Sequence, residues 1–395
     1  MSTCGTTNSG KAIGSSTGKS GAGAAGMLAG TGSRPRPFAP DKILGHKDRV
    51  QEWMRTGRSR PVTYELDMTN VCNHRCPGCF GFYPERDAAA MSLERAQSVI
   101  LQIRDLGGRG LTFTGGGDPL VNPATPGAVE YAAGLGLDVG FITNAQSLRP
   151  ETADLLLRRC VWIRVSLDAA TPEMFRLTHG MGPEAFAAVL ENVRGLVRRK
   201  RELGSAVTVG VGFLTSRETA PDVFAFAALG RELGVDYAQY RPLLRQIGRP
   251  EIDHSDGDVL REMLRGRDAF SSGDYRVVCS EHKYRLIAEG KTERSYGKCY
   301  GQHFAAVVAA DGKMYVCCHM RGVERYALGD LSAETLEGVW NSERRQAVVR
   351  SVDFRDCPPL CRCDSFNGIL WDLKRGERRL EDAPDEGEWE HRNFI

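Results

Sequence analysis

The sequence contains no apolar run that approaches the roughly 18 residues needed to span a membrane. It also lacks the hydrophobic core of a signal peptide near its N-terminus. Its 52 basic and 50 acidic residues leave a formal net charge of +2, and no long block of one sign is present. These absences argue against a membrane or nucleic acid as a partner and favour a cytoplasmic protein.

Apolar periodicity is missing from the first part of the chain. Residues 1–40 are rich in Gly, Ser, Thr and Ala, which predicts a disordered tail in which Cys4 is an idle thiol. The remaining residues suffice for one large domain and a smaller one. The chain has twelve cysteines, and most lie at metal-ligand spacings, as expected in a reducing compartment.

Strand-like and helix-like patterns alternate after residue 60. Strands are predicted at residues 63–68, 110–114, 138–143, 162–166, 207–213 and 237–241. Helices are predicted between them, at residues 93–106, 128–133, 152–159, 185–203 and 222–233. Strands separated by helices pair in parallel, because parallel neighbours need a crossover connection. The pattern therefore predicts an α/β fold with a parallel sheet.

Three thiols, Cys72, Cys76 and Cys79, follow the first predicted strand in a CxxxCxxC spacing. Soft thiolates suit iron or zinc, and three of them leave one metal position open. A structural zinc site needs four ligands, and the nearest fourth is His74, which would have to fold back within its own loop. A four-iron cluster with one open iron fits the three thiols better than zinc does.

This spacing, followed by the aromatic Phe80, resembles the signature of the radical S-adenosylmethionine (radical SAM) superfamily. The resemblance implies a partial (β/α)6 TIM-like barrel over residues 55–245, with the chemistry at the C-terminal strand ends. It also implies a 4Fe-4S cluster that binds SAM, cleaves it with one electron and yields a 5′-deoxyadenosyl radical that abstracts hydrogen. Flavodoxin or ferredoxin would serve as the external electron donor.

A glycine-rich segment, Gly115, Gly116 and Gly117 followed by Asp118, comes directly after the second predicted strand. Taken alone, it is consistent with a tight turn. In the resembled family this loop receives the amino group of SAM. The family more often has Glu at the position of Asp118, and the shorter side chain of Asp puts direct contact in doubt.

Polar residues end the later strands: Asn144 the third, Ser166 and Asp168 the fourth, and Arg241 the sixth. Helix capping and Asx turns would also place such residues there. In the family the equivalent of Ser166 contacts the SAM ribose or carboxylate, and neighbouring polar groups assist. Arg241 has three candidate partners: the SAM carboxylate, an acidic substrate or a surface acid.

A second set of cysteines follows a charged connector, which spans residues 246–294 and holds one predicted helix at 259–264. A hairpin turn at Asp311-Gly312 lies between two of these thiols, and a single helix is predicted at residues 336–349. The set comprises Cys299, Cys317, Cys318, Cys357, Cys361 and Cys363. It resembles the SPASM and twitch domains, which implies an auxiliary 4Fe-4S cluster in a hairpin-plus-helix domain over residues 295–375, followed by a tail at 376–395.

The resemblance makes Cys299 and Cys317 cluster ligands, completed by two of Cys357, Cys361 and Cys363. Their CxxxCxC spacing departs from the usual CxxC, so the spare thiol is not identified. The twitch type, with one cluster, is favoured because no ligand-rich segment follows Cys363. A zinc site built from the same thiols is the alternative.

The auxiliary cluster limits the reaction outcomes. It could accept an electron from the substrate radical, as in dehydrogenases. In an epimerase, a thiol such as Cys160, Cys279 or Cys318 would instead return a hydrogen atom. Cys160 ends a predicted helix, where filling the core is the commoner role, and a lone pair such as Cys279 and His282 is more often incidental.

Two substrate classes remain, and both imply a radical SAM enzyme. The first ~60 residues offer too little ordered chain for a peptide-recognition domain, so the sequence favours a small polar substrate. An aminoglycoside, aminocyclitol or nucleoside sugar in antibiotic biosynthesis is therefore expected. The alternative is a maturase of a ribosomally made peptide. A non-catalytic iron–sulfur carrier would need neither a SAM loop nor an open iron.

Overall fold

The computed structural model describes residues 38–79, 88–247, 251–254, 258–383 and 389–395. Arg36–Ile395 form one compact unit. Nearly all of the predicted N-terminal tail, with Cys4, lies outside the described residues. Among the helices that are described, none is both long and apolar enough to cross a lipid bilayer.

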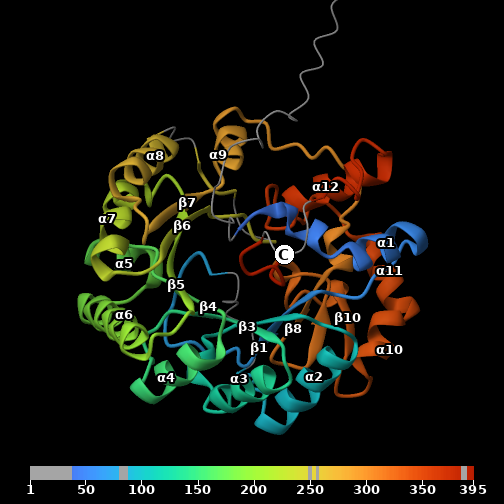
Figure 1. The fold of residues 1–395 in the computed structure, drawn as a ribbon. Coiled ribbons are helices and arrows are strands. Elements are labelled where there is room, and N and C mark those ends of the chain that lie inside the picture. Colours follow the sequence, from blue (N-terminus) through green and yellow to red (C-terminus); the bar gives the residue numbers. More distant parts are fainter. Residues whose placement is uncertain (1–37, 80–87, 248–250, 255–257, 384–388) are drawn as a thin grey trace, which may run out of the picture. The chain divides into compact units, whose positions relative to one another are not determined.

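Ten strands of the described chain form one sheet in the order β10-β9-β8-β1-β2-β3-β4-β5-β6-β7 (Figure 1). Strands β8 and β1 to β7 run parallel, and β9 and β10 are antiparallel additions at one edge. The bounds are β1 Thr63–Asp67, β2 Gly110–Thr114, β3 Asp138–Thr143, β4 Trp162–Ser166, β5 Thr208–Thr215, β6 Tyr237–Pro242, β7 Arg276–Cys279, β8 Ala305–Val308, β9 Lys313–Tyr315 and β10 Ala327–Asp330.

Helices connect the parallel strands and lie outside them in an arc from α2 to α8 (Figure 1). Ser92 is the N-cap of α2, and its side chain accepts a hydrogen bond from the Arg95 amide at 3.2 Å. The bounds are α1 Lys47–Thr56, α2 Leu93–Asp105, α3 Thr125–Gly134, α4 Pro150–Arg159, α5 Pro172–His179, α6 Pro183–Leu203, α7 Val223–Leu233, α8 Asp258–Phe270, α9 Glu281–Ala288, α10 Leu336–Asn341, α11 Glu343–Ser351 and α12 Asp364–Arg375.

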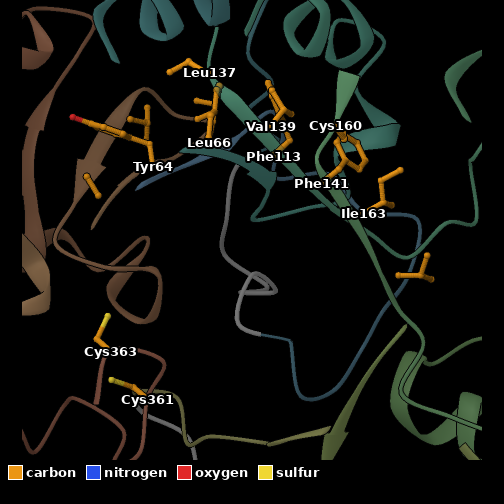
Figure 2. Packing of buried hydrophobic residues seen from close by; sticks show 14 of the residues in the cluster. Tyr64, Leu66, Phe113, Leu137, Val139, Phe141, Cys160, Ile163, Cys361 and Cys363 are labelled. Atoms are coloured by element: carbon orange, nitrogen blue, oxygen red, sulfur yellow. The ribbon is translucent and has the colours of Figure 1, made fainter. Parts of the chain in front are cut away.

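The outward face of the strands supplies the core. Leu66, Phe113, Phe141 and Ile163 are buried against the helices, and Cys160 packs with them (Figure 2). Because side chains alternate along a strand, the residues between these positions point to the other face. The side chains on that inner face are therefore available to form a site.

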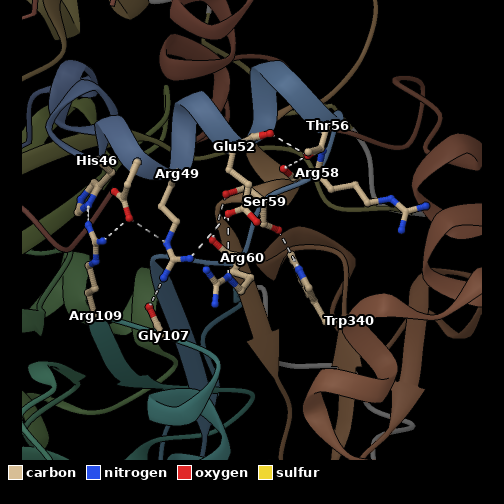
Figure 3. Close-up of polar contacts among 11 residues, drawn as sticks. His46, Arg49, Glu52, Thr56, Arg58, Ser59, Arg60, Gly107, Arg109 and Trp340 are labelled. Carbon is tan, nitrogen blue, oxygen red and sulfur yellow. Dashed lines mark hydrogen bonds and ion pairs between the residues drawn. The ribbon is translucent and has the colours of Figure 1, made fainter.

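Helix α1 and the residues flanking it contact both the barrel and the C-terminal part of the chain (Figure 3). Arg49 donates to the Gly107 carbonyl at 2.8 Å, before β2, and Arg109 donates to His46 at 2.8 Å. Just after α1, the Ser59 carbonyl accepts from the Trp340 indole of α10 at 2.9 Å. The segment before β1 therefore contacts both halves of the unit.

The predicted α/β partial barrel is confirmed, but the parallel sheet is larger than six strands. The charged connector contains β7, which is only four residues long and too short to show a period in the sequence. The single helix predicted at residues 336–349 is two helices. The first helix, α10, ends at Asn341. Ser342 is the N-cap of the second helix, α11, and its side chain accepts a hydrogen bond from the Arg345 amide at 3.0 Å.

Residues 389–395, predicted as part of a tail, cover the starts of several strands. The Asn393 carbonyl accepts from Thr63 Oγ1 at 2.6 Å, and its Nδ2 donates to Asp138 Oδ2 at 2.8 Å. Glu390 pairs with Arg276 at the start of β7, at 2.9 Å. This segment therefore lies at the end of the barrel opposite the predicted chemistry.

Candidate active site

A cavity of about 580 Å³ occupies the inner face of the barrel, bounded by the strands, the thiol loop after β1 and loops of the C-terminal part. Among the predicted site residues, those that line it are Cys72, Cys76, Cys79, Gly115, Gly116, Gly117, Asp118, Asn144, Ser166, Asp168, Arg241 and Cys318. Phe80 lies outside the described residues. The topology therefore brings strand ends from distant parts of the sequence to one space.

The three thiols of the CxxxCxxC loop face this cavity. Cys72 Sγ accepts from the His74 amide at 3.4 Å and from Asn144 Nδ2 at 3.8 Å. Burial raises the pKa of Cys72 to about 11 and raises the pKa of Cys76 further. Thiols this reluctant to ionise become thiolates when a cationic group binds them, which releases their protons.

The imidazole of His74 is hydrogen-bonded to the imidazole of His179 in α5. Their Nδ1 atoms are 3.0 Å apart, and His179 Nε2 lies 3.0 Å from the Leu167 carbonyl. Since a carbonyl only accepts, His179 Nε2 carries the proton and its Nδ1 accepts from His74. Burial lowers the pKa of both rings to about 4, so both are neutral at pH 7.

These two imidazoles bear on the zinc alternative. Within the part of the chain that the structure describes, His74 and His179 group with a single thiol of the loop, Cys76, and their ligand atoms lie within 4.8 Å of one another. Cys76 Sγ lies 3.4 Å from His179 Nδ1. The three thiols share the cavity without His74 completing a four-ligand set around them, so the donor set fits a cluster held by three cysteines.

The glycine-rich loop lies against the thiol loop backbone to backbone. The Gly117 amide donates to the Thr69 carbonyl at 2.8 Å, and the Asp118 amide donates to the Val71 carbonyl at 3.2 Å. A Cβ on Gly117 would lie 1.9 Å from the Val71 oxygen. Glycine is therefore required at position 117 by this approach, which brings the predicted SAM loop beside Cys72.

The Asp118 carboxylate is buried and accepts three internal donors. They are Thr143 Oγ1 at 2.8 Å, the Asn144 amide at 2.6 Å and the Leu120 amide at 2.9 Å. Burial raises its pKa, while these hydrogen bonds act in the opposite direction. Asp118 thus joins the glycine loop to the end of β3 and positions Asn144. Its predicted contact with SAM stays a prediction.

Asn144 and the end of β4 complete this side of the cavity. Asn144 Nδ2 donates to Asn73 Oδ1 at 2.7 Å, within the thiol loop. Asp168 has a φ of 46° and accepts from the Leu214 amide at 2.6 Å. Burial raises the pKa of Asp168 to about 6, against the nearby guanidinium charges. The cofactor roles of Asn144, Ser166 and Asp168 stay predictions.

The auxiliary thiols gather around Cys361, which contacts Cys357 and Cys363; Figure 2 shows Cys361 and Cys363 close together. Cys299 and Cys317 lie near enough to interact electrostatically with Cys361, and burial raises the pKa of both. Asn367 Nδ2 donates to Cys299 Sγ at 3.7 Å. This concentration of thiols fits a cluster, whereas Cys318 points toward the barrel cavity.

The three thiols predicted as hydrogen donors occupy different places. Cys318 lines the cavity. Cys160 is buried in the core between sheet and helices (Figure 2). Cys279 ends β7 and packs against the core, outside the described lining of the cavity.

A buried ion network that sequence analysis missed joins β1 to the auxiliary region. Arg321, which follows the Cys317-Cys318 pair, contacts Glu65 at 2.9 Å and Asp67 at 2.5 Å. Arg362, between two auxiliary thiols, also pairs with Glu65. Burial would raise the pKa of Glu65, but Arg362 and Arg321 bring it below its ordinary value. The network fastens the thiol-bearing loops to the strand that precedes Cys72.

Comparisons with known proteins agree with this geometry. The Radical SAM superfamily model matches residues 66–226, and the model of an iron–sulfur cluster-binding domain, SPASM, matches residues 299–364. Mycofactocin maturase MftC of Mycobacterium ulcerans is 29% identical over 274 residues, which cover 68% of this chain and 71% of the relative. A probable GTP 3′,8-cyclase of Saccharolobus islandicus is 28% identical over 199 residues, 50% of this chain and 62% of the relative.

Two solved structures show the same fold. Streptococcus suis SuiB bound to the precursor peptide SuiA has a TM-score of 0.61 at 14% identity, covering 78% of this chain and 70% of that one. Native anSMEcpe with bound AdoMet has a TM-score of 0.55 at 16% identity, covering 81% of this chain and 98% of that one.

The two family models fall on the two thiol sets that the structure places at the cavity and beside it. The cofactors are therefore SAM, the iron–sulfur cluster of the radical SAM domain and an auxiliary iron–sulfur cluster. Residues 66–226 of the chain therefore form a radical SAM domain, and residues 299–364 form a C-terminal SPASM domain.

Proposed function

We propose that this enzyme is a maturase that modifies a ribosomally made precursor peptide. The observation that carries the proposal is the similarity to mycofactocin maturase MftC across 68% of this chain. The match to the cyclase covers 50% of the chain, so it supports a different substrate less well. SuiB, whose structure was solved with a precursor peptide, supplies the fold precedent.

The prediction of a small sugar or nucleoside substrate is wrong, because these relatives are a maturase and a protein bound to a precursor peptide. The names of the relatives reported above support neither an antibiotic-pathway oxidoreductase nor an epimerase. The prediction had relied on the lack of ordered sequence before residue 60. That reasoning assumed that peptide recognition needs a separate N-terminal domain.

The chain's own residues divide the work of such a reaction. Cys72, Cys76 and Cys79 would hold the first cluster, and the Asn144 amide group supports Cys72. When bound, this cluster and SAM supply one-electron cleavage of SAM and hence a species that abstracts hydrogen. The cavity walls orient the peptide segment and exclude water. Cys299, Cys317 and two of Cys357, Cys361 and Cys363 would supply the auxiliary cluster's ligands, and an external donor such as flavodoxin or ferredoxin would supply the electron.

The test pairs the reconstituted enzyme with the peptide encoded by a short reading frame beside its gene. Under anaerobic conditions with SAM and dithionite, we expect a mass change in the peptide and formation of 5′-deoxyadenosine. Cys76→Ala should yield neither. An unmodified peptide together with a modified amino sugar in a parallel reaction would overturn the proposal.

A further inference from the structure

The inner face of strands β4 to β6 combines cationic residues with glycines. Arg164 on β4 and Gln239 and Arg241 on β6 line the cavity. On β5, which lies between them, Gly210 pairs with Arg164 and Gly212 pairs with Gln239 in the sheet register. Glycine at both positions removes side chains that would otherwise project into the cavity.

The missing side chain at Gly212 makes room for two arginines. A Cβ built there would lie 3.5 Å from Arg164 Cδ and 3.7 Å from Arg241 Nη2. Both side chains therefore lie over the same residue of β5. The neighbouring Gly210 is covered by the Tyr237 ring, which a Cβ would approach to 2.2 Å. The two guanidinium groups are thus brought together in a space shaped by glycine and an aromatic wall.

Neither arginine has a carboxylate partner within the described part of the chain. Arg164 Nη1 donates to the neutral Gln239 side chain at 3.2 Å. The Nε atoms of Arg164 and Arg241 are buried, and no described residue accepts a hydrogen bond from them. Burial, and then the charge of Arg241, lowers the pKa of Arg164 to about 9. Arg321, by contrast, is paired with two carboxylates.

The nearby acids form no ion pair with either arginine among the described residues. Asp168 accepts from the Leu214 amide through Oδ1 and interacts with the charges of Arg241 and Arg164 only at longer range, and Glu65 pairs with Arg321 and Arg362. Holding two cations in a partly buried space without a bound anion is costly. An arrangement of this kind is stabilised when an anion enters with its own oxygens as acceptors.

We propose that Arg164 and Arg241 form a subsite for a carboxylate group of the substrate peptide, which rests on the proposed function. A planar carboxylate matches the fork of a guanidinium, and peptides carry this group on Asp and Glu side chains and at the C-terminus. Gln239 acts as a positioning residue by holding Arg164. SAM carries the same chemical group, so the test must separate the two sources.

The position of Arg164 deep in the barrel favours the substrate peptide over SAM as the source of the carboxylate. Arg164 lies two residues before Ser166, where β4 ends, so it is about 7 Å farther from the strand ends. The thiol loop and the glycine loop both follow strand ends. A group that reaches Arg164 must therefore enter the barrel below these loops.

The binding test uses N-acetylglutamate α-amide and, as a neutral match, N-acetylglutamine α-amide. Equilibrium dialysis is done anaerobically on the reconstituted enzyme saturated with SAM and without reductant. We expect the acidic probe to bind more tightly, and Arg164→Gln to weaken it by at least about tenfold while the dissociation constant of SAM changes less than twofold. Arg158→Gln, on the exposed side of α4, is the matched control and should change neither constant.

A second variant guards against a folding defect. Arg164→Lys keeps the charge without the fork, so it should retain part of the acidic probe's affinity that Arg164→Gln loses. Equal binding of both probes to the wild type would overturn the proposal. So would a tenfold loss of SAM affinity in Arg164→Gln with unchanged probe binding, which would assign the pair to the SAM carboxylate. Selective probe binding with no peptide modified would refute the proposed function and leave this subsite standing.

Discussion

Replacing Gly117 with Ala tests the contact between the glycine loop and the thiol loop. The new Cβ would lie 1.9 Å from the Val71 oxygen, a distance that must grow to at least about 3.0 Å, and the atoms in the way are backbone. Overpacking of this kind costs about 1–3 kcal/mol. Separation of the two loops also breaks the hydrogen bonds from the Gly117 amide to the Thr69 carbonyl and from the Asp118 amide to the Val71 carbonyl, at about 1 kcal/mol each. The sum is about 3–5 kcal/mol.

We expect Gly117→Ala to lower the melting temperature by at least about 5 °C and to reduce the iron bound after anaerobic reconstitution, because Val71 directly precedes Cys72. Circular dichroism and iron analysis measure the two effects. Gly134→Ala is the matched control, since a Cβ there meets no atom within 4 Å. Wild-type melting and wild-type iron content in Gly117→Ala would refute the account of this loop.

Three further predictions concern the rest of the unit. Cys317→Ala should remove about one cluster's worth of iron while SAM binding, measured by dialysis, is retained; zinc in the anaerobically purified wild type would contradict this. Glu65→Gln should destabilise the protein by about 2–3 kcal/mol in thermal unfolding, less than a fully broken buried pair because Asp67 still holds Arg321; the exposed Glu151→Gln should have no effect. Burial lowers the pKa of His46 to about 4, so between pH 6.5 and pH 4 the unfolded chain binds a proton that the folded chain does not, and the folded state loses stability as the pH is lowered. His46→Gln should therefore reduce the stability lost between pH 6.5 and pH 5 by about 1.5 kcal/mol, and an unchanged pH profile of stability would contradict this.

Local patterns in the sequence sufficed for much of the fold. The bounds of β2, β3 and β4 agree with the prediction because each strand is a short segment rich in apolar and β-branched residues between turn residues. Strand β7 has four residues and α10 is separated from α11 by one, so neither feature shows in a periodicity. The motif of Cys72, Cys76 and Cys79 could be recognised in the sequence because its spacing is local.

Contacts between distant residues could not be predicted in this way. His74 and His179 are 105 residues apart, and Glu65 and Arg321 are 256 apart. Arg164 was overlooked although it alternates with Trp162 and Ser166, a period that places all three on one face of β4. Which face borders a cavity depends on the closed arrangement of all the strands. The internal hydrogen bonds of Asp118 likewise required the end of β3 to be placed beside it.

The most direct test of the central claim measures 5′-deoxyadenosine and peptide mass in one anaerobic reaction. The sample contains the reconstituted enzyme, SAM, dithionite and the peptide encoded beside its gene, and mass spectrometry follows both products over time. The account predicts that the modified peptide accumulates together with 5′-deoxyadenosine in the wild type and that neither forms with Cys76→Ala. Full formation of both products by Cys76→Ala, or an unmodified peptide beside abundant 5′-deoxyadenosine in the wild type, would contradict it.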